Sequence, residues 1–257
     1  MVILAIDTTT RGGSVAVTRD NEQLSLVGGD ETRTHGERMP AEIAHALEQA
    51  GISKSDLDLI SVAAGPGAFT GLRIGLAAAQ GVALTLDRPV VGVSTLDALA
   101  WTIAVEAPAA ESGPGDALIA PWMDAQRGDV FAALYRSNPI RLRAKAEGLR
   151  EHSWPPWTVI DRPVTARPRV VLESWQSHAG HADVVFVGDA VSRDEALIAQ
   201  IGEGRWRLRQ PDPLAPAIAA IGRRLALEGR AGKPHVLTPI YARRPDAEID
   251  RERRRPS

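Results

Sequence analysis

The glycine-rich segment GPGAFTGLRIG, residues 65–75, constrains the fold of this chain more than any other feature of its sequence. The apolar run before it, residues 57–64, predicts a buried strand, and the Ala- and Leu-rich run after it, residues 70–86, predicts a helix. Glycine permits the positive φ angles that a tight turn between them needs, and Thr70 is the expected N-cap. A strand, a glycine loop and a helix in this order can bind an anion or pack closely on another backbone.

The predicted helix carries a ridge of small residues, because Gly71, Gly75 and Ala79 follow one another at intervals of four. Each glycine inside a helix costs roughly 0.5–1 kcal/mol relative to alanine, so a close contact should offset it. That contact can be made within the chain or with a partner protein, and the sequence favours neither.

Residues 1–106 predict one α/β unit that opens with three short strands, the first of which ends at Asp7. Helices and strands then alternate, with Gly51 as the expected C-cap of one helix and Ser94 as the N-cap of another. The predicted segments are strands 2–6, 14–18, 23–27, 57–64 and 89–93, and helices 39–50, 70–86 and 95–105.

The same plan begins again after residues 107–116, which are rich in Ala, Pro, Gly and Ser and predict a linker. An apolar strand again ends at an acidic residue, Asp124, and is followed by a glycine turn and a second strand. We therefore expect two α/β halves with mixed sheets flanked by helices, residues 1–106 and 117–245, and a disordered basic tail, residues 246–257. Later predicted elements are helices 170–177, 195–201 and 216–228 and strand 184–187, whereas segment 136–168 gives no assignment.

The composition excludes several classes of protein. The net charge of −2 gives no indication of bulk nucleic-acid binding, and the absence of cysteine excludes disulfides and thiolate chemistry. No apolar run approaches the roughly 20 residues that span a membrane, and the first residues do not resemble a signal peptide. We expect a soluble, cytoplasmic protein without a membrane partner.

The histidines and serines suggest no catalytic site. His35 and His45 have no metal-binding neighbours at suitable spacing and are expected on the surface. His178 and His181 have helical spacing, but the intervening Gly180 makes them a poor metal site. A Gly-x-Ser-x-Gly nucleophile motif is absent from the sequence.

Three segments together resemble the TsaB (YeaZ) family: AIDTT at residues 5–9, the glycine-rich segment at 65–75, and VGVSTL at 91–96. Residues 124–130 and 239–243 extend the resemblance into the second half. Gln126 departs from the family pattern, which has a basic residue there.

The resemblance implies two RNase H-like halves, as in the actin, sugar-kinase and Hsp70 (ASKHA) group. It also implies a non-catalytic subunit that forms a heterodimer with TsaD, joined by the ATPase TsaE. That complex transfers a threonylcarbamoyl group to adenosine 37 of ANN-reading tRNAs. The tRNA is expected to bind to the assembled complex. TsaD-like proteins carry a His-x-x-x-His metal motif after the strand equivalent to 89–93, where this chain has Thr95 and Leu99. Leucine cannot bind a metal, so we expect no catalysis here.

The resemblance places the TsaD contact on helices 39–50 and 70–86, which could pack with two partner helices. Without TsaD the same surface is expected to form a homodimer. Replacement of Gly75 by a bulky residue is expected to weaken the TsaD pair without unfolding the chain. The expected contacts are Met39, Ile43, Leu47, Gly71, Ile74, Gly75 and Ala78.

Two alternatives remain open. In an autonomous ATP-binding phosphotransferase of the same fold, Asp7, Thr8 and Thr9 would bind Mg²⁺ and phosphate, although Asp7 can instead cap its own turn. The single Gly188 in the second half argues against an independent ATP site, so we expect no intrinsic cofactor, and ATP or ADP with Mg²⁺ only at the TsaD interface. Alternatively, the arginines of residues 251–255 could contact tRNA phosphates.

Overall fold

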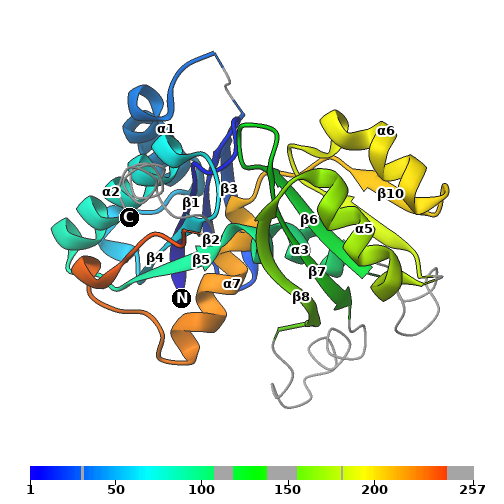
Figure 1. The fold of residues 1–257 in the computed structure, drawn as a ribbon. Coiled ribbons are helices and arrows are strands. Elements are labelled where there is room, and N and C mark those ends of the chain that lie inside the picture. Colours follow the sequence, from blue (N-terminus) through cyan, green and yellow to red (C-terminus); the bar gives the residue numbers. More distant parts are fainter. Residues whose placement is uncertain (30–31, 107–117, 138–154, 181, 242–257) are drawn as a thin grey trace, which may run out of the picture.

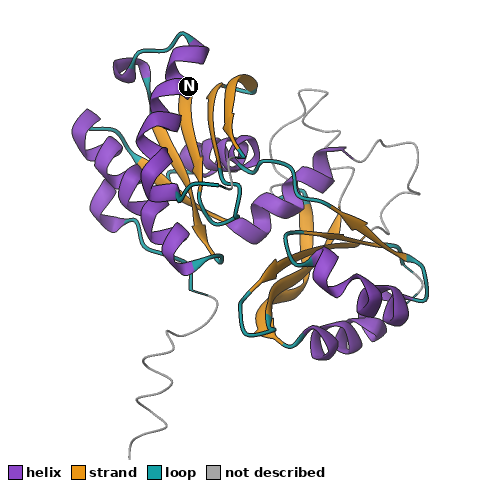
Figure 2. Cartoon of the chain, turned by 90° about the horizontal axis from the view of Figure 1, so that it is seen from above, coloured by secondary structure: helices purple, strands orange, loops and turns teal. Residues whose placement is uncertain are grey.

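The structure is a computed structural model that describes residues 1–29, 32–106, 118–137, 155–180 and 182–241. It contains two five-stranded mixed sheets, one in each half of the chain, with helices packed on both (Figures 1 and 2). The predicted α/β class with two sheets flanked by helices is confirmed. The predicted linker and basic tail lie outside the described residues.

The first sheet has the strand order β3-β2-β1-β4-β5, with β1 antiparallel to β2 and parallel to β4. Strand β1 is buried along almost its whole length, because it lies at the centre with helices on both faces. The elements of this half are β1 (Val2–Asp7), β2 (Ser14–Arg19), β3 (Glu22–Gly28), α1 (His35–Ala50), a 3₁₀ turn η1 (Lys54–Asp56), β4 (Leu59–Gly65), α2 (Phe69–Leu86), β5 (Val90–Ser94) and α3 (Thr95–Glu106).

The second sheet has the order β10-β9-β6-β7-β8, which repeats the topology of the first. The internal repeat expected from the two strands that end in aspartate is therefore present in the fold. The elements from residue 118 onward are β6 (Leu118–Asp124), β7 (Val130–Ser137), β8 (Trp157–Ala166), α5 (Pro168–Ala179), β9 (Val184–Val187), α6 (Val191–Gly202), β10 (Trp206–Arg209), α7 (Ala215–Leu227) and a 3₁₀ turn η2 (Pro234–Val236).

Helices α3 and α7 lie between the two sheets, and each packs on the sheet of the other half (Figure 1). Helix α7 covers β1, β2 and β4, while α3 contacts β6, β7 and β9. The Ser61 hydroxyl donates to the Ile218 carbonyl at 2.9 Å, and the Ala215 amide donates to the Ser14 hydroxyl at 3.0 Å. The predicted C-terminal boundary of the second half, residue 245, is therefore wrong, because α7 and the segment after it pack with the first half.

Several boundaries also differ from the predictions. Helix α2 begins at Phe69 with Ala68 as its N-cap, so Thr70 lies within the helix rather than capping it. Helix α1 begins at His35, four residues before the predicted start, and β8 and β10 were not predicted. The other two predicted caps are confirmed: Gly51 ends α1 with φ of 62°, and Ser94 accepts the Asp97 amide at the start of α3.

Helix α2 is the one helix of the described residues that is long and apolar enough to cross a membrane by length and composition. Its inner face, with Leu72, Leu76 and Ala79, is instead buried on the sheet and against α1. This packing accounts for that part of its apolar character. The rest of α2 forms two further surfaces, one beside α1 and one beside the chain that follows α7.

Candidate functional site

An apolar groove with a volume of about 470 Å³ lies between α1 and α2, which run side by side in Figure 1. Five of the seven expected partner contacts line it. From α1 these are Met39, Ile43 and Leu47, and from α2 they are Ile74 and Ala78. The remaining lining residues are Gly36, Pro40, Ala44, Lys54, Leu57, Gly81, Val82, Thr85 and Leu86.

The five residues occupy two levels of the groove. Met39, Ile43 and Leu47 are 2%, 9% and 5% exposed, so they form its floor and belong mainly to the core. Ile74 and Ala78 are half-buried and line its α2 side. The sequence predicted that these residues share a surface, but it could not show which of them are buried in the core and which remain accessible to a partner.

Small residues on both helices keep the groove open. Gly36, Ala44 and Gly81 are exposed on its rim, and a Cβ atom added to Gly81 would meet no other atom within 4 Å. Lys54 is the one charged residue among those that line the groove. An apolar depression between two helices is a suitable site for an apolar helix face of another protein.

Gly71 and Gly75 do not belong to this groove, and their predicted role as partner contacts is wrong. Both are buried against the turn after β1, where the Thr8 hydroxyl donates to the Gly71 carbonyl at 2.7 Å. A Cβ atom on Gly71 would overlap the Thr8 carbonyl oxygen, and one on Gly75 would overlap the Thr8 hydroxyl. The close contact that offsets the helical glycines is therefore within the chain.

The turn after β1 is closed by Asp7, which is 0% exposed. One carboxylate oxygen accepts the Thr9 amide at 2.8 Å and the Thr9 hydroxyl at 2.6 Å, and the other accepts the Thr10 hydroxyl at 2.5 Å. The alternative in which Asp7 caps its own turn matches these contacts. Burial and these hydrogen bonds engage both oxygens within the turn, and the binding of Mg²⁺ or a nucleotide by Asp7, Thr8 and Thr9 stays a prediction.

The place of the metal motif is filled by buried residues. Thr95 and Leu99 are both 0% exposed, and the Thr95 hydroxyl donates to the Thr9 hydroxyl at 3.3 Å. Within the described parts of the chain, no three His, Cys, Asp or Glu side chains are grouped so that they could hold a metal ion. His181 lies outside the described residues, and His178 contacts the Ser174 carbonyl of its own helix.

His35 is half-buried, so its predicted surface position is wrong, whereas His45 is exposed as expected. The His35 Nε2 lies 3.0 Å from the Thr10 carbonyl oxygen and donates to it, which leaves Nδ1 to accept from the Arg38 guanidinium at 2.8 Å. Burial lowers the pKa of His35, and the charge of Arg38 lowers it further. A neutral imidazole thus links the start of α1 to the turn after β1.

Arg38 was not singled out in the sequence, although it is only 2% exposed. It donates to the Gly12 carbonyl at 2.5 Å and forms an ion pair with Glu42 at 2.6 Å. The i, i+4 spacing of Arg38 and Glu42 was the available signal. Together with His35, Arg38 fixes α1, and hence one wall of the groove, relative to the first sheet.

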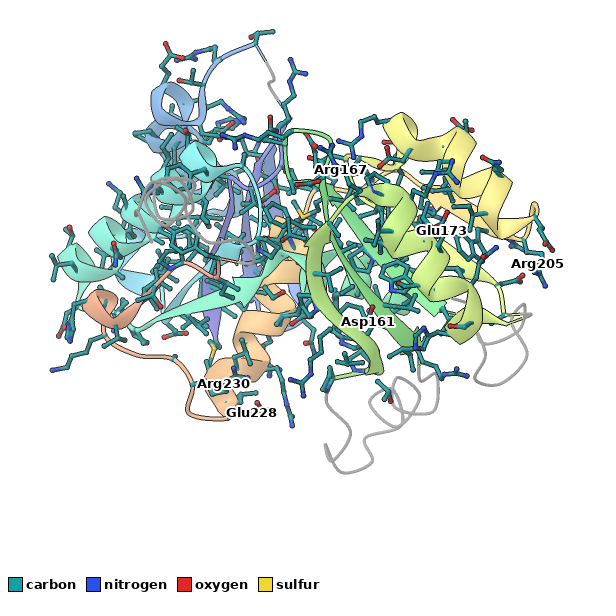
Figure 3. The ribbon with its side chains drawn as sticks, viewed as in Figure 1. Asp161, Arg167, Glu173, Arg205, Glu228 and Arg230 are labelled. Atoms are coloured by element: carbon teal, nitrogen blue, oxygen red, sulfur yellow. The ribbon has the colours of Figure 1, made fainter. Side chains whose placement is uncertain are left out.

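The equivalent turn of the second half is held differently. Asp124 accepts the Gln126 amide at 3.1 Å and its side chain at 2.9 Å, and it pairs with the Arg193 guanidinium. Arg167, labelled in Figure 3, donates to the Arg127 carbonyl at 2.7 Å. Gln126, which departs from the family pattern, therefore donates both its main-chain and its side-chain amide to Asp124, which caps this turn.

Two further residues of this region have packing roles. Asp189 accepts the Asp124 amide at 2.9 Å, and burial is the main cause that raises the pKa of its carboxyl group. Gly188 has φ of 146°, and a Cβ atom there would overlap the Trp122 carbonyl oxygen. Packing on β6 thus accounts for Gly188 without an adenosine-binding loop.

Residues 28–200 match the family model described as "TsaD: tRNA N6-adenosine threonylcarbamoyltransferase". The chain is 29% identical over 253 residues to the tRNA threonylcarbamoyladenosine biosynthesis protein TsaB of Bacillus subtilis, covering 96% of each chain. It is 28% identical to the TsaB protein of Escherichia coli, covering 95% of each. An uncharacterized protein of Mycobacterium tuberculosis is 30% identical, with coverage of 95% of this chain and 93% of that protein.

Solved structures share the fold. YeaZ from Pseudomonas aeruginosa superposes with a TM-score of 0.68 at 23% identity, covering 93% of this chain and 99% of that one. A second structure, described as an uncharacterized protein with similarity to peptidase YeaZ from the same organism, gives 0.71 at 24% identity, with coverage of 94% and 99%. The two-sheet architecture of this chain is therefore that of the YeaZ structures.

Proposed function

The chain belongs to the TsaB (YeaZ) group of the TsaD-related family, and we propose that it is a non-catalytic partner of TsaD in threonylcarbamoyladenosine formation on tRNA. The relatives named TsaB are described as tRNA threonylcarbamoyladenosine biosynthesis proteins. In this proposal the chain is needed for transfer of the threonylcarbamoyl group to adenosine 37 of ANN-reading tRNAs. It acts in the cytoplasm as one subunit of a complex.

The apolar groove between α1 and α2 is the observation that carries this proposal. Its floor is built into the core and its rim includes the small residues Gly36, Ala44 and Gly81, so two helices of TsaD can approach closely at these points. Without TsaD, a second copy of the chain uses the same groove and forms a homodimer. TsaE joins the pair through the assembled complex.

The absence of catalysis in this subunit is supported by what replaces the expected chemistry. Leu99 stands at a metal-ligand position of TsaD-like proteins, and the Asp7 oxygens are occupied by Thr9 and Thr10. A nucleotide with Mg²⁺ at the interface would therefore depend on TsaD for its metal ligands. ATP hydrolysis by the isolated chain would instead favour the phosphotransferase alternative.

Replacement of Gly81 by glutamate tests the groove. The new side chain meets no atom of its own chain near Cβ and introduces a charge into the apolar contact, so we expect the chain to fold but to lose most of its affinity for TsaD. Burial of an unpaired charge in an interface costs about 2–5 kcal/mol, or a loss of at least about 30-fold in affinity. Affinity is measured by titration with TsaD, and function by the yield of modified tRNA.

Ala41→Glu is the matched control, because Ala41 is exposed on α1 and does not line the groove. It adds the same charge to the other helix of the pair. The proposal is wrong if Gly81→Glu binds TsaD and supports modification as well as Ala41→Glu does.

A further inference from the structure

The side of α2 away from the groove carries an exposed group of aromatic and cationic side chains that the proposed function does not use. Phe69 is 49% exposed at the start of α2, and Tyr241 is 44% exposed at the end of the described chain. Their ring centroids are 6.2 Å apart. The Arg73 guanidinium lies 3.9 Å from the centroid of the Phe69 ring. We call these three residues the outer α2 surface.

The chain after α7 holds Tyr241 in this position. The Ile240 amide donates to the Ala64 carbonyl at 2.6 Å, and the Gln80 side chain donates to the Pro234 and Leu237 carbonyls at 3.0 and 3.2 Å. A Cβ atom on Gly65 would lie 2.6 Å from the Ile240 carbonyl oxygen, so the glycine loop is shaped to receive this segment. These hydrogen bonds therefore hold the backbone that places Tyr241 beside Phe69 of α2.

Arg73 is the cation of this surface. Residues 59–86, which include all of α2, contain Arg73 but no Asp or Glu, and residues 229–241 contain no Asp or Glu either. This local balance contrasts with the net charge of −2 of the whole chain. Two exposed aromatic rings beside the Arg73 guanidinium form a surface that attracts phosphate and offers flat faces to bases.

We infer that the outer α2 surface binds an unpaired region of the tRNA substrate. Tyr241 stacks on a base, and the Arg73 guanidinium, which already lies over Phe69, provides a second stacking plane and a phosphate contact. This inference rests on the proposed function and adds a direct RNA contact by the non-catalytic subunit. The groove is lined from α2 by Ile74 and Ala78, so TsaD and RNA would occupy different sides of the helix.

The test uses the chain in complex with TsaD and a labelled, unmodified transcript of an ANN-reading tRNA, titrated by fluorescence anisotropy. Phe69→Leu and Tyr241→Leu keep an apolar side chain but remove the ring, and each should weaken tRNA binding about 5–30-fold. Arg73→Gln should lower the slope of log affinity against log salt by about 1. Val170→Ala and Arg169→Gln, exposed on α5, are the matched controls and should bind as the unsubstituted chain does.

A fully paired RNA hairpin of equal length distinguishes stacking from general attraction to phosphate. The leucine variants should bind this hairpin unchanged. Equal losses on tRNA and hairpin, or unchanged binding to both, would overturn the inference. Loss of TsaD binding with unchanged tRNA affinity would also overturn it and assign the surface to a protein contact.

Size-exclusion chromatography without RNA separates this inference from the proposed function. If the unsubstituted chain does not pair with TsaD, the proposed function fails, and titration of tRNA with the chain alone then decides the RNA contact. If the pair forms and the three variants bind tRNA as tightly as the two controls do, only the RNA contact fails.

Discussion

The two halves of the molecule repeat one strand order but close the turn after their first strand in different ways. In the first half Asp7 is fully buried, and the glycines of α2 pack directly on Thr8. In the second half the Asp124 side chain is 35% exposed and is held by the Arg193 guanidinium. The first turn is thus built by packing and the second by charge.

The outer helices of the two halves also differ in the surface that they expose. Helices α1 and α2 leave an apolar groove between them, whereas α5 carries the exposed Arg169–Glu173 ion pair, whose Glu173 is labelled in Figure 3. The two copies of the fold thus differ in the outer surface of their helices, which is apolar between α1 and α2 and carries an exposed ion pair on α5. Helix α2 packs on the sheet, and its other sides lie beside α1 and beside the chain that follows α7.

The largest expected effect comes from disturbing the contact between α2 and the turn after β1. Gly75→Ala places a methyl group against the Thr8 hydroxyl, so we expect a loss of about 2–3 kcal/mol in the free energy of unfolding. This corrects the expectation that substitution there spares the fold. Gly81→Ala, on the same helix with open space around it, should gain about 0.5–1 kcal/mol. Urea unfolding measures the change in the free energy of unfolding for both variants. A change of the same sign in both would contradict the prediction.

The second effect compares the two aspartates directly. Asp7→Ala leaves the two buried Thr9 donors and the partly buried Thr10 hydroxyl without their acceptor, which should cost about 1–3 kcal/mol. Asp124→Ala removes a partly exposed ion pair and should cost less than about 1 kcal/mol. Thermal unfolding measures both, and a larger loss for Asp124→Ala would reverse the distinction between packing and charge.

The smallest effect concerns the link between α1 and the first turn. Folding lowers the pKa of His35 below its ordinary value of 6.5, so the unfolded chain binds this proton more tightly. The free energy of unfolding should therefore fall as the pH drops below about 6.5, until the folded pKa is reached. His35→Gln, which can still donate and accept, should reduce this decline by less than about 1 kcal/mol, since the ring is only half-buried. Chemical unfolding at several pH values between about 7 and 5 measures it, and an unchanged pH dependence would contradict the role of His35.

The sequence predicted most of the fold because apolar runs, caps and the glycine loop are local signals. The family resemblance, rather than residue spacing, placed Ile74 and Ala78 of α2 on the same predicted surface as Met39 of α1. It could not show that Gly75 faces inward, since the contact is with Thr8, far away in the chain. For the same reason it placed α7 in the wrong half, because Ile218 meets Ser61 only in the folded molecule.

The exchange of α3 and α7 between the halves has a consequence for synthesis of the chain. Ile3 and Leu59 of the first sheet share their core with Ile218 of α7, which leaves the ribosome long after them. One apolar face of that sheet therefore remains uncovered while the second half is being made. Since domains tend to fold in the order of synthesis, the first half must wait for its last helix, and a chain truncated before α7 would expose this face to aggregation or to chaperones.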